Sequence, residues 1–264
     1  MDKLILGRYI PGDSIIHRLD PRSKLLAMFG FLLMIFLANN LVTNALLIAF
    51  VLGMVVLSRI RLSFFINGLK PMIGIILFTT FFQVFFTLGA TILWEFWIFK
   101  LSVEGLQQAA IIFVRFVLII FFSTLLTLTT TPLSLADGIE SGLAPLKRFR
   151  VPVHEIGLML SMSLRFVPTL MDDTTRIMNA QRARGVDFNE GNLIQKVKSV
   201  IPILIPLFAS SFKRADALAT AMEARGYQGG EGRTKYRILA WKWADTVAIL
   251  VMIAVALVLY FLKN

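Results

Sequence analysis

The sequence predicts an all-α integral membrane protein with about five transmembrane helices and a cytoplasmic coupling region of one short and two long helices. Of its 264 residues, 57% are hydrophobic and only 16% are charged, whereas soluble domains are close to half apolar and a quarter charged. The apolar residues gather in runs long enough to cross a bilayer, and the basic residues gather between these runs. These patterns divide the chain into four spans with their N-terminal segment (1–131), the coupling region (132–243) and a last span (244–264).

The segment before the first apolar run predicts a helix start at the membrane boundary. That run begins only at Leu25 and carries no small-residue cleavage site, so we expect no signal peptide. Asp20 is placed to cap a helix and Pro21 suits the first helical position. Arg22 and Lys24 follow. They fit either an ordinary cationic membrane boundary or a contact with a partner protein.

Four spans are predicted before residue 132. The nearly uncharged stretch 25–58 is too long for one span of roughly 20 residues, and it divides at Asn39-Asn40 into two helices. A loop over 59–70, with Arg59, Arg61 and Lys70, leads to a third span over 72–88. The fourth span covers 106–130.

Two features accompany the fourth span. Trp94 and Trp97, with Lys100, precede it and are typical of an interfacial belt. Arg115 lies inside it, where an unpaired charge is costly. We therefore expect Arg115 to face protein or water, as a snorkelling or internally paired side chain.

The distribution of basic residues predicts the orientation. Between Pro132 and Lys242 there are 16 Lys or Arg against 10 Asp or Glu, and the last apolar span runs from Ala244 to Leu262. The positive-inside rule places the N-terminal segment, the loop over 59–70 and the coupling region in the cytoplasm. Five spans then place the C-terminus outside.

The coupling region is predicted to hold a short amphipathic helix over 132–149, broken at Arg150-Val151-Pro152, and then two long helices. The first long helix, 153–184, is roughly 45 Å long at ~1.5 Å per residue. Both long helices begin apolar and end polar. Their apolar halves, 158–170 and 200–212, have about 13 residues each, short of a span, so we expect them at the inner membrane surface or packed on the other spans.

Both long helices end in the same three residues, Ala183-Arg184-Gly185 and Ala224-Arg225-Gly226. One such triplet carries little information, because helices commonly end with a cation in the last turn and a glycine beyond it. Two on matched helices indicate one device used twice. Chance plus capping stays open as the alternative. An arginine at such an end offers a planar fork of donors for carboxylates and backbone carbonyls of a partner.

These residues give the chain a resemblance to a known family. With Leu19-Asp20-Pro21-Arg22-Ser23-Lys24-Leu25 and the two triplets, it resembles the T component of energy-coupling factor (ECF) transporters, the transmembrane coupling subunit of ABC-type vitamin and metal importers. The hydropathy profile matches over essentially the whole chain. The resemblance implies that each triplet docks in a groove on one of two ATPase subunits, identical or different. It also implies that the partners bind ATP and that this chain binds no cofactor.

The resemblance also implies a second partner, a substrate-binding membrane S component held by the apolar parts of the long helices. We expect its contacts at Met159, Met162, Phe166, Leu204 and Phe208. Flexible methionine side chains suit a surface that accepts varying partners. The implied function is a non-catalytic coupling subunit for micronutrient uptake, of a vitamin or a metal ion, in the cell membrane of a prokaryote. ATP binding would draw the two arginine ends toward each other. In this family the substrate is chosen by another subunit.

Two other classes of function make different demands on the sequence. An autonomous channel or secondary transporter predicts ionisable residues at the bilayer midplane, where only Arg115 qualifies. An intramembrane enzyme needs histidine or clustered acidic residues inside the spans. His17 and His154 fall outside them, where we expect hydrogen-bonding roles, and Asp245 lies at an edge. The absence of cysteine excludes thiolate chemistry, and the net charge of +11 is attributed to the membrane rather than to nucleic acid.

Overall fold

The computed structural model describes residues 9–87, 92–96, 99–186, 188, 192–229 and 238–263. The chain forms two compact units, one made of Met1–Gly142 with Leu239–Asn264 and the other of Leu143–Ile238. We call them the bundle and the helix pair. The short helix after Pro132 belongs to the bundle by its contacts, although the predicted coupling region, 132–243, includes it.

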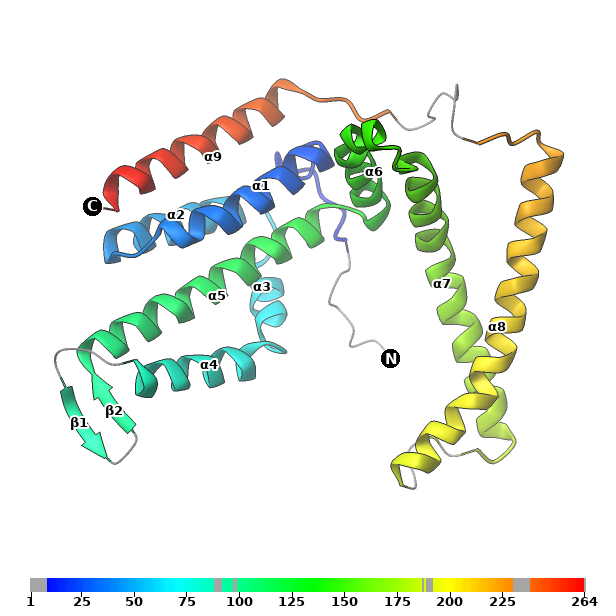
Figure 1. Ribbon diagram of the computed structural model, residues 1–264, viewed down its shortest axis with the longest axis horizontal. Coiled ribbons are helices and arrows are strands. Elements are labelled where there is room, and N and C mark those ends of the chain that lie inside the picture. Colours follow the sequence, from blue (N-terminus) through cyan, green and yellow to red (C-terminus); the bar gives the residue numbers. More distant parts are fainter. Residues whose placement is uncertain are drawn as a thin grey trace. The chain divides into compact units, whose positions relative to one another are not determined.

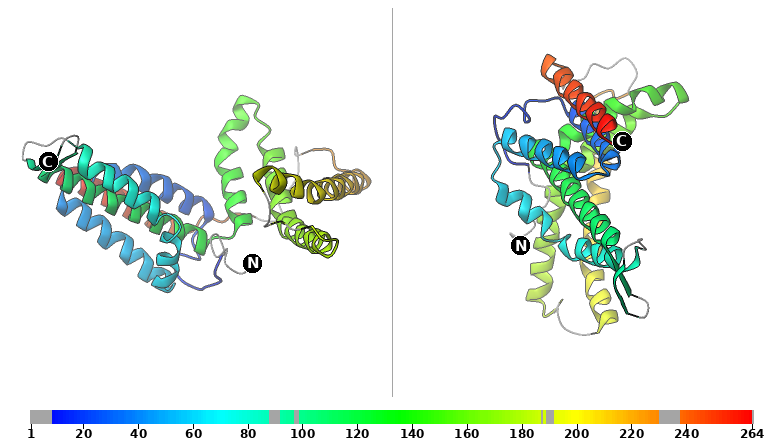
Figure 2. Two further views of the ribbon diagram at one scale, coloured as in Figure 1. Left: turned by 90° about the horizontal axis from the view of Figure 1, so that it is seen from below. Right: turned by 90° about the vertical axis from the view of Figure 1, so that its left-hand side faces the viewer.

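The bundle is built from helices that pack side by side, and α1 packs against both α9 and α5 (Figures 1 and 2). Its helices are α1 (Pro21–Met34), α2 (Leu41–Ser58), α3 (Leu62–Leu69), α4 (Ile73–Phe86), α5 (Val103–Thr129), α6 (Pro132–Leu143) and α9 (Trp243–Leu262). A 3-10 turn, η1 (Ile35–Leu37), extends α1, and the strands β1 (Ile92–Phe96) and β2 (Phe99–Ser102) form an antiparallel hairpin before α5. The all-α membrane fold predicted from the sequence is confirmed.

The core of the bundle is apolar and joins α1, α2, α5 and α9. Phe31 of α1 is fully buried and stacks on Phe122 of α5, with ring centroids 4.3 Å apart. Leu47 of α2 and Leu259 of α9 are fully buried in the same cluster. Stacked aromatic pairs and close packing of this kind fix the neighbours of each helix.

A buried hydrogen-bond network joins the first turns of α1 and α9. The carboxylate of Asp245 is fully buried and accepts three hydrogen bonds, from the Asp20 backbone N–H (2.7 Å), the Ser23 hydroxyl (2.7 Å) and the Lys242 backbone N–H (2.8 Å). Asp20 itself caps α1, where its side chain accepts from the Arg22 N–H, and Pro21 occupies the first helical position as predicted. The network therefore sets the two helix starts at the same level.

Lys24 brings the end of α5 to the same level. Its ammonium group is buried and donates to the Thr129 carbonyl (2.9 Å) and to the Thr130 hydroxyl (3.1 Å). At the opposite end of the bundle, the Asn40 side chain donates to the Lys263 carbonyl (3.3 Å), next to the start of α2 and the end of α9. We call the end with Lys24 and Asp245 the cationic end, because Arg18, Arg22, Arg59, Arg61 and Lys242 also lie there or in the adjoining turns.

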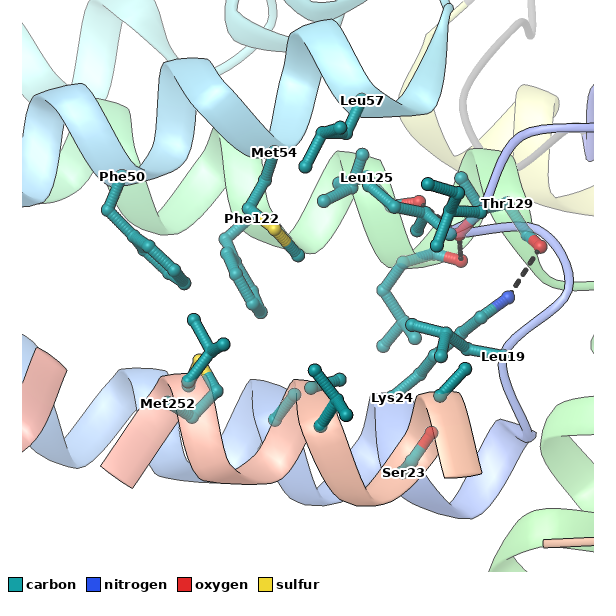
Figure 3. Close-up of a pocket in the computed structure, with 18 residues that line it drawn as sticks. Leu19, Ser23, Lys24, Phe50, Met54, Leu57, Phe122, Leu125, Thr129 and Met252 are labelled. Carbon is teal, nitrogen blue, oxygen red and sulfur yellow. Dashed lines mark hydrogen bonds between the residues drawn. The ribbon is translucent and has the colours of Figure 1, made fainter. Parts of the chain in front are cut away.

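An apolar cavity of about 210 Å³ lies inside the bundle beside this network. Figure 3 shows Phe50, Met54 and Leu57 of α2 across the cavity from Met252 of α9, with Phe122 and Leu125 of α5 between them. The bond from Lys24 to Thr129 borders the cavity at its polar end. The charge of Lys24 is thus directed to backbone and hydroxyl oxygens, and its carbon chain lines the apolar space.

His17 makes hydrogen bonds, as predicted. Its ring nitrogens lie 2.6 Å from the Ser14 hydroxyl and 3.1 Å from the Ile10 carbonyl. Burial lowers the pKa of the His17 imidazole below its usual value, so the ring is neutral at pH 7.

The candidate spans differ in one respect from those predicted. Within the described ranges, four helices are long and apolar enough to cross a membrane: α2, α5, α9 and the Ile194–Ala224 part of α8 (Leu193–Ala224). The pair α3 and α4, bent by 64°, makes a fifth if it is one span. The spans predicted from the sequence included α1 and did not include α8. With 14 residues α1 is too short by itself, although it packs along α9, and α8 qualifies because its helix continues through both prolines.

One prediction between residues 59 and 102 needs correction. The loop expected over 59–70 contains the helix α3, because Arg59 adopts a left-handed conformation (φ 57°) that ends α2 and lets the apolar residues after it form a new helix turn. The backbone of Trp94 lies in a β-hairpin and pairs with Leu101, and the place of Trp94 in an interfacial belt stays a prediction. Three parts of the predictions lie outside the described residues: the first eight residues, residue 88 at the end of the third predicted span, and Trp97.

Arg115 is held inside the protein. Its guanidinium donates to the Ala38 carbonyl (3.3 Å) and lies 5.2 Å from the ring centroid of Phe36. This contact confirms that the cation faces protein, and it joins α5 to the turn that follows α1.

The helix pair consists of η2 (Ala144–Phe149), α7 (Val153–Ala183) and α8 (Leu193–Ala224). Arg150 has a positive φ of 60° and separates η2 from α7, at the break that the sequence predicts. Both long helices are confirmed. The second one begins at Leu193, seven residues before its predicted apolar half, and continues through Pro202 and Pro206.

We predict that Asp245→Ala destabilises the bundle by about 2–4 kcal/mol, because three buried donors lose their acceptor. The measurement is the free energy of unfolding in detergent micelles. Asp13→Ala is the control, since the Asp13 side chain is 94% exposed and pairs with Arg18 only at 3.8 Å; we expect it to change stability by less than about 0.5 kcal/mol. Equal stabilities for the two variants would contradict the structural role of the network.

Candidate partner-docking site

The two Ala-Arg-Gly triplets end α7 and α8 in the same backbone geometry. At the first end, the Gly185 N–H donates to the Arg182 carbonyl (2.9 Å) and the Val186 N–H to the Gln181 carbonyl (3.0 Å). At the second end, the Gly226 N–H donates to the Glu223 carbonyl (2.9 Å) and the Tyr227 N–H to the Met222 carbonyl (3.0 Å). This pair of bonds defines the Schellman motif. The two ends are structural copies of each other.

The glycines are required for their conformation rather than for space. Gly185 has a φ of +87° and Gly226 a φ of +70°, in the left-handed region that costs other residues energy. A Cβ atom built on either glycine meets no heavy atom within 4 Å. The surface beside each glycine is therefore open.

Both arginines are exposed, and so are the alanines and glycines beside them. A cation at a helix C-terminus is favoured by the helix dipole, so each arginine is stable there without a partner. An exposed guanidinium on a slim end can donate a bidentate pair of hydrogen bonds to a carboxylate or to backbone carbonyls. The arrangement fits binding of another protein.

Figure 1 shows α7 and α8 running in opposite directions. Arg184 follows the last residue of α7 and Arg225 follows the last residue of α8, so the two arginines lie at opposite ends of the helix pair. Two separate partner surfaces can therefore be engaged at once.

The second end includes a residue that was predicted for another role. A pocket of about 500 Å³ is lined by Arg225, Gly226 and Tyr227, and also by Leu158 and Met162 of α7. Met162 was predicted as a contact for the S component. It lies beside one arginine end because α7 and α8 run in opposite directions, and its contact with the S component stays a prediction.

The other predicted contact residues lie on the two long helices with partly or fully accessible side chains. Met159, Leu204 and Phe208 are exposed, and Phe166 is half-buried. Six further large apolar side chains of α8 are exposed: Ile194, Val197, Val200, Ile201, Ile205 and Phe212. Together with Leu204 and Phe208 they recur at spacings of three or four residues, and we call these eight side chains the α8 stripe. The same periodicity is visible in the sequence.

Sequence reasoning also missed the polar contact that joins α7 to α8. The Arg214 guanidinium forms an ion pair and hydrogen bond with the Asp173 carboxylate. The signal was present, since these two residues are 41 positions apart, as are Arg184 and Arg225.

No arrangement in the described part of the chain suits a metal ion. Within those residues there is no group of three His, Cys, Asp or Glu side chains that could hold one.

The comparisons with known proteins agree with each other. Residues 12–236 match the family model described as CbiQ, cobalt transport protein. A protein of Streptococcus equi subsp. equi named energy-coupling factor transporter transmembrane protein EcfT is 72% identical over 264 residues, which cover all of this chain and 98% of that protein. Proteins of the same name from Streptococcus thermophilus and Bacillus subtilis are 68% and 53% identical, each over the whole of this chain and at least 99% of their own length.

We predict that Gly185→Ala and Gly226→Ala each destabilise the local helix end by about 1–2 kcal/mol, because alanine is strained at these φ values. The readout is amide hydrogen exchange at Val186 and Tyr227, which we expect to accelerate about tenfold. Gly142→Ala is the control, since Gly142 lies in α6 and a Cβ atom there meets nothing within 4 Å. Unchanged exchange at both ends would show that the left-handed conformation is not what closes these helices.

Proposed function

This chain belongs to the family of energy-coupling factor transporter transmembrane proteins, and we propose that within such a transporter its long helices transmit the motion of two ATPase subunits to a substrate-binding S component. The observation that carries the proposal is the pair of matching, exposed arginine ends. The substrate class we propose is a micronutrient, a vitamin or a metal ion. The catalytic step, ATP hydrolysis, belongs to the partners in this proposal.

The docking of each ATPase subunit rests on Ala183-Arg184-Gly185 and on Ala224-Arg225-Gly226. Each arginine supplies a charge-assisted fork for carboxylate or carbonyl oxygens of a groove. The small alanine and glycine leave the end narrow enough to enter it. Because the ends have the same backbone geometry, either two identical subunits or two related ones fit them.

The S component is proposed to pack on the apolar surface of the long helices, at Met159, Phe166 and the α8 stripe. A stripe of large exposed apolar side chains on one helix face is typical of a surface covered by lipid or by another helix. Met162, which lines the pocket beside Arg225, is where the two proposed contact regions meet.

The orientation we propose places the cationic end of the bundle and the helix pair in the cytoplasm. The cations at that end outnumber those near the start of α2 and the end of α9, as the positive-inside rule requires. The ATPase subunits then meet the arginine ends on the side where ATP is present, in the cell membrane of a prokaryote.

The mechanism we propose is mechanical. ATP binding draws the two ATPase subunits together and moves the arginine ends, and the continuous helices carry this motion to their apolar halves. The S component is then released or reoriented because its contacts differ between the two arrangements. Coupling requires such a difference in contact free energy between states.

We predict that Arg184→Glu and Arg225→Glu each weaken ATPase binding by about tenfold or more, since a like charge in a carboxylate-lined groove is repelled. The double variant should lose the ATPases. The measurement is ATPase stoichiometry after copurification in detergent. Arg176→Glu, an exposed position in the polar half of α7, is the matched control and should copurify normally. Wild-type stoichiometry for the double variant would refute docking at these ends.

A further inference from the structure

The ion pair between α7 and α8 joins equivalent positions of the two helices. Asp173 precedes Arg184 by eleven residues, and Arg214 precedes Arg225 by eleven residues. Superposing the two triplets along the sequence therefore superposes Asp173 on Arg214. These two residues contact each other directly.

The buried faces of the two helices follow the same correspondence. Leu170 and Ser211 are equivalent and both half-buried, and the same holds for Ile177 with Leu218 and for Gln181 with Met222. At these positions the half-buried residues of the two helices correspond, counted from the same glycine, and α7 packs against α8. Two copies packed about a two-fold axis would show such a correspondence.

A residue on a two-fold axis meets its own equivalent, so identical charged residues there would repel. The two helices carry opposite charges at this position, Asp173 against Arg214. The neighbouring position shows the same exchange of sign, Asp172 against Lys213, although both of those side chains are exposed. Opposite charges at equivalent positions are what a duplicated helix needs in order to pair with its copy.

We propose that Asp173 and Arg214 form the pivot on which α7 and α8 cross. They act as positioning residues that hold Arg184 and Arg225 at equal distances from this crossing point, on opposite sides of it. This inference rests on the proposed function, because it concerns how the docked ends move. The pair is shielded from solvent, with 15% of the Asp173 side chain and 32% of the Arg214 side chain exposed. The Nη1 atom of Arg214 is buried and has no hydrogen-bond partner among the described residues. Removing the carboxylate would therefore leave a half-buried cation uncompensated.

The pivot converts rotation into movement of the ends. Each arginine is eleven residues from it, roughly 17 Å at ~1.5 Å per residue, so a rotation of about 10° moves an arginine end by about 3 Å. Contacts near the pivot hardly move. A fixed point between two moving ends is what a pair of levers requires.

The first test is a charge exchange in the full transporter complex reconstituted in liposomes. Asp173→Arg places two cations at the pivot and Arg214→Asp places two carboxylates there, and each should lower substrate uptake per ATP hydrolysed by about tenfold or more. The double exchange restores opposite charges and should recover most of the loss. Asp172→Arg and Lys213→Asp make the same charge changes at the exposed neighbouring position and should leave uptake unchanged.

The outcomes separate this inference from the proposed function. Single variants that keep both ATPase subunits but lose uptake, with recovery in the double exchange, support the pivot. Normal uptake in both single variants, or no recovery in the double exchange, overturns it. Absence of ATPase subunits from the wild-type complex would instead refute the proposed docking.

A second test does not depend on whether the charge variants fold. The chain has no cysteine, so pairs can be introduced without removing any. A Cys pair at Asp173 and Arg214 should form a disulfide at the same rate with and without ATP. Spin labels at the equivalent exposed positions Arg182 and Glu223 should change their separation by several Å when ATP is added, about the displacement that the lever length gives. A nucleotide-dependent disulfide at the pivot, or a constant separation of the labels, would overturn the inference.

Discussion

The bundle depends on one buried carboxylate. Asp245 accepts hydrogen bonds from the first turns of both α1 and α9. One of its donors, the backbone N–H of Asp20, lies 225 positions away along the chain. Burying an ion is costly unless donors surround it, so the two helices can pack only with these turns at one level. Lys24 then fixes the end of α5 at that level. The starts of α1 and α9 and the end of α5 therefore lie together, so α5 runs opposite to the other two helices, and the cations gather at this end of the bundle.

The helix pair is organised by a different constraint, its internal repetition. The same Schellman hydrogen bonds close both long helices, and equivalent faces meet across the ion pair of Asp173 and Arg214. Most helical stability in proteins comes from tertiary packing rather than from propensity, so the contact between α7 and α8 helps to order both helices. The C-terminal ends of both helices remain exposed, because their arginines and glycines take no part in the ion pair between α7 and α8. Packing at the middle and exposure at the ends suit a pair of levers.

Much of this arrangement could be predicted from the sequence because it rests on local chemistry. Asp20 and Pro21 start α1 by capping rules, and the glycines after Arg184 and Arg225 end their helices by a conformational rule. Other features depend on contacts between distant residues, which one sequence does not display. Nothing near Asp245 in the sequence shows that it bonds to Asp20, and the left-handed conformation of Arg59, which produces α3, has no glycine to signal it. The placement of Met162 beside Arg225 follows only from the antiparallel course of α7 and α8.

Site-specific photocrosslinking in the assembled transporter tests the central claim, that both arginine ends are seated on ATPase subunits, most directly. A photoreactive amino acid in place of Ala183 or Ala224, both exposed beside their arginines, reports what touches each end. Our account predicts that both positions yield adducts with an ATPase subunit, whereas the exposed α7 position Thr169 does not. Adducts from Ala183 and Ala224 that contain only lipid or other parts of this chain would contradict it.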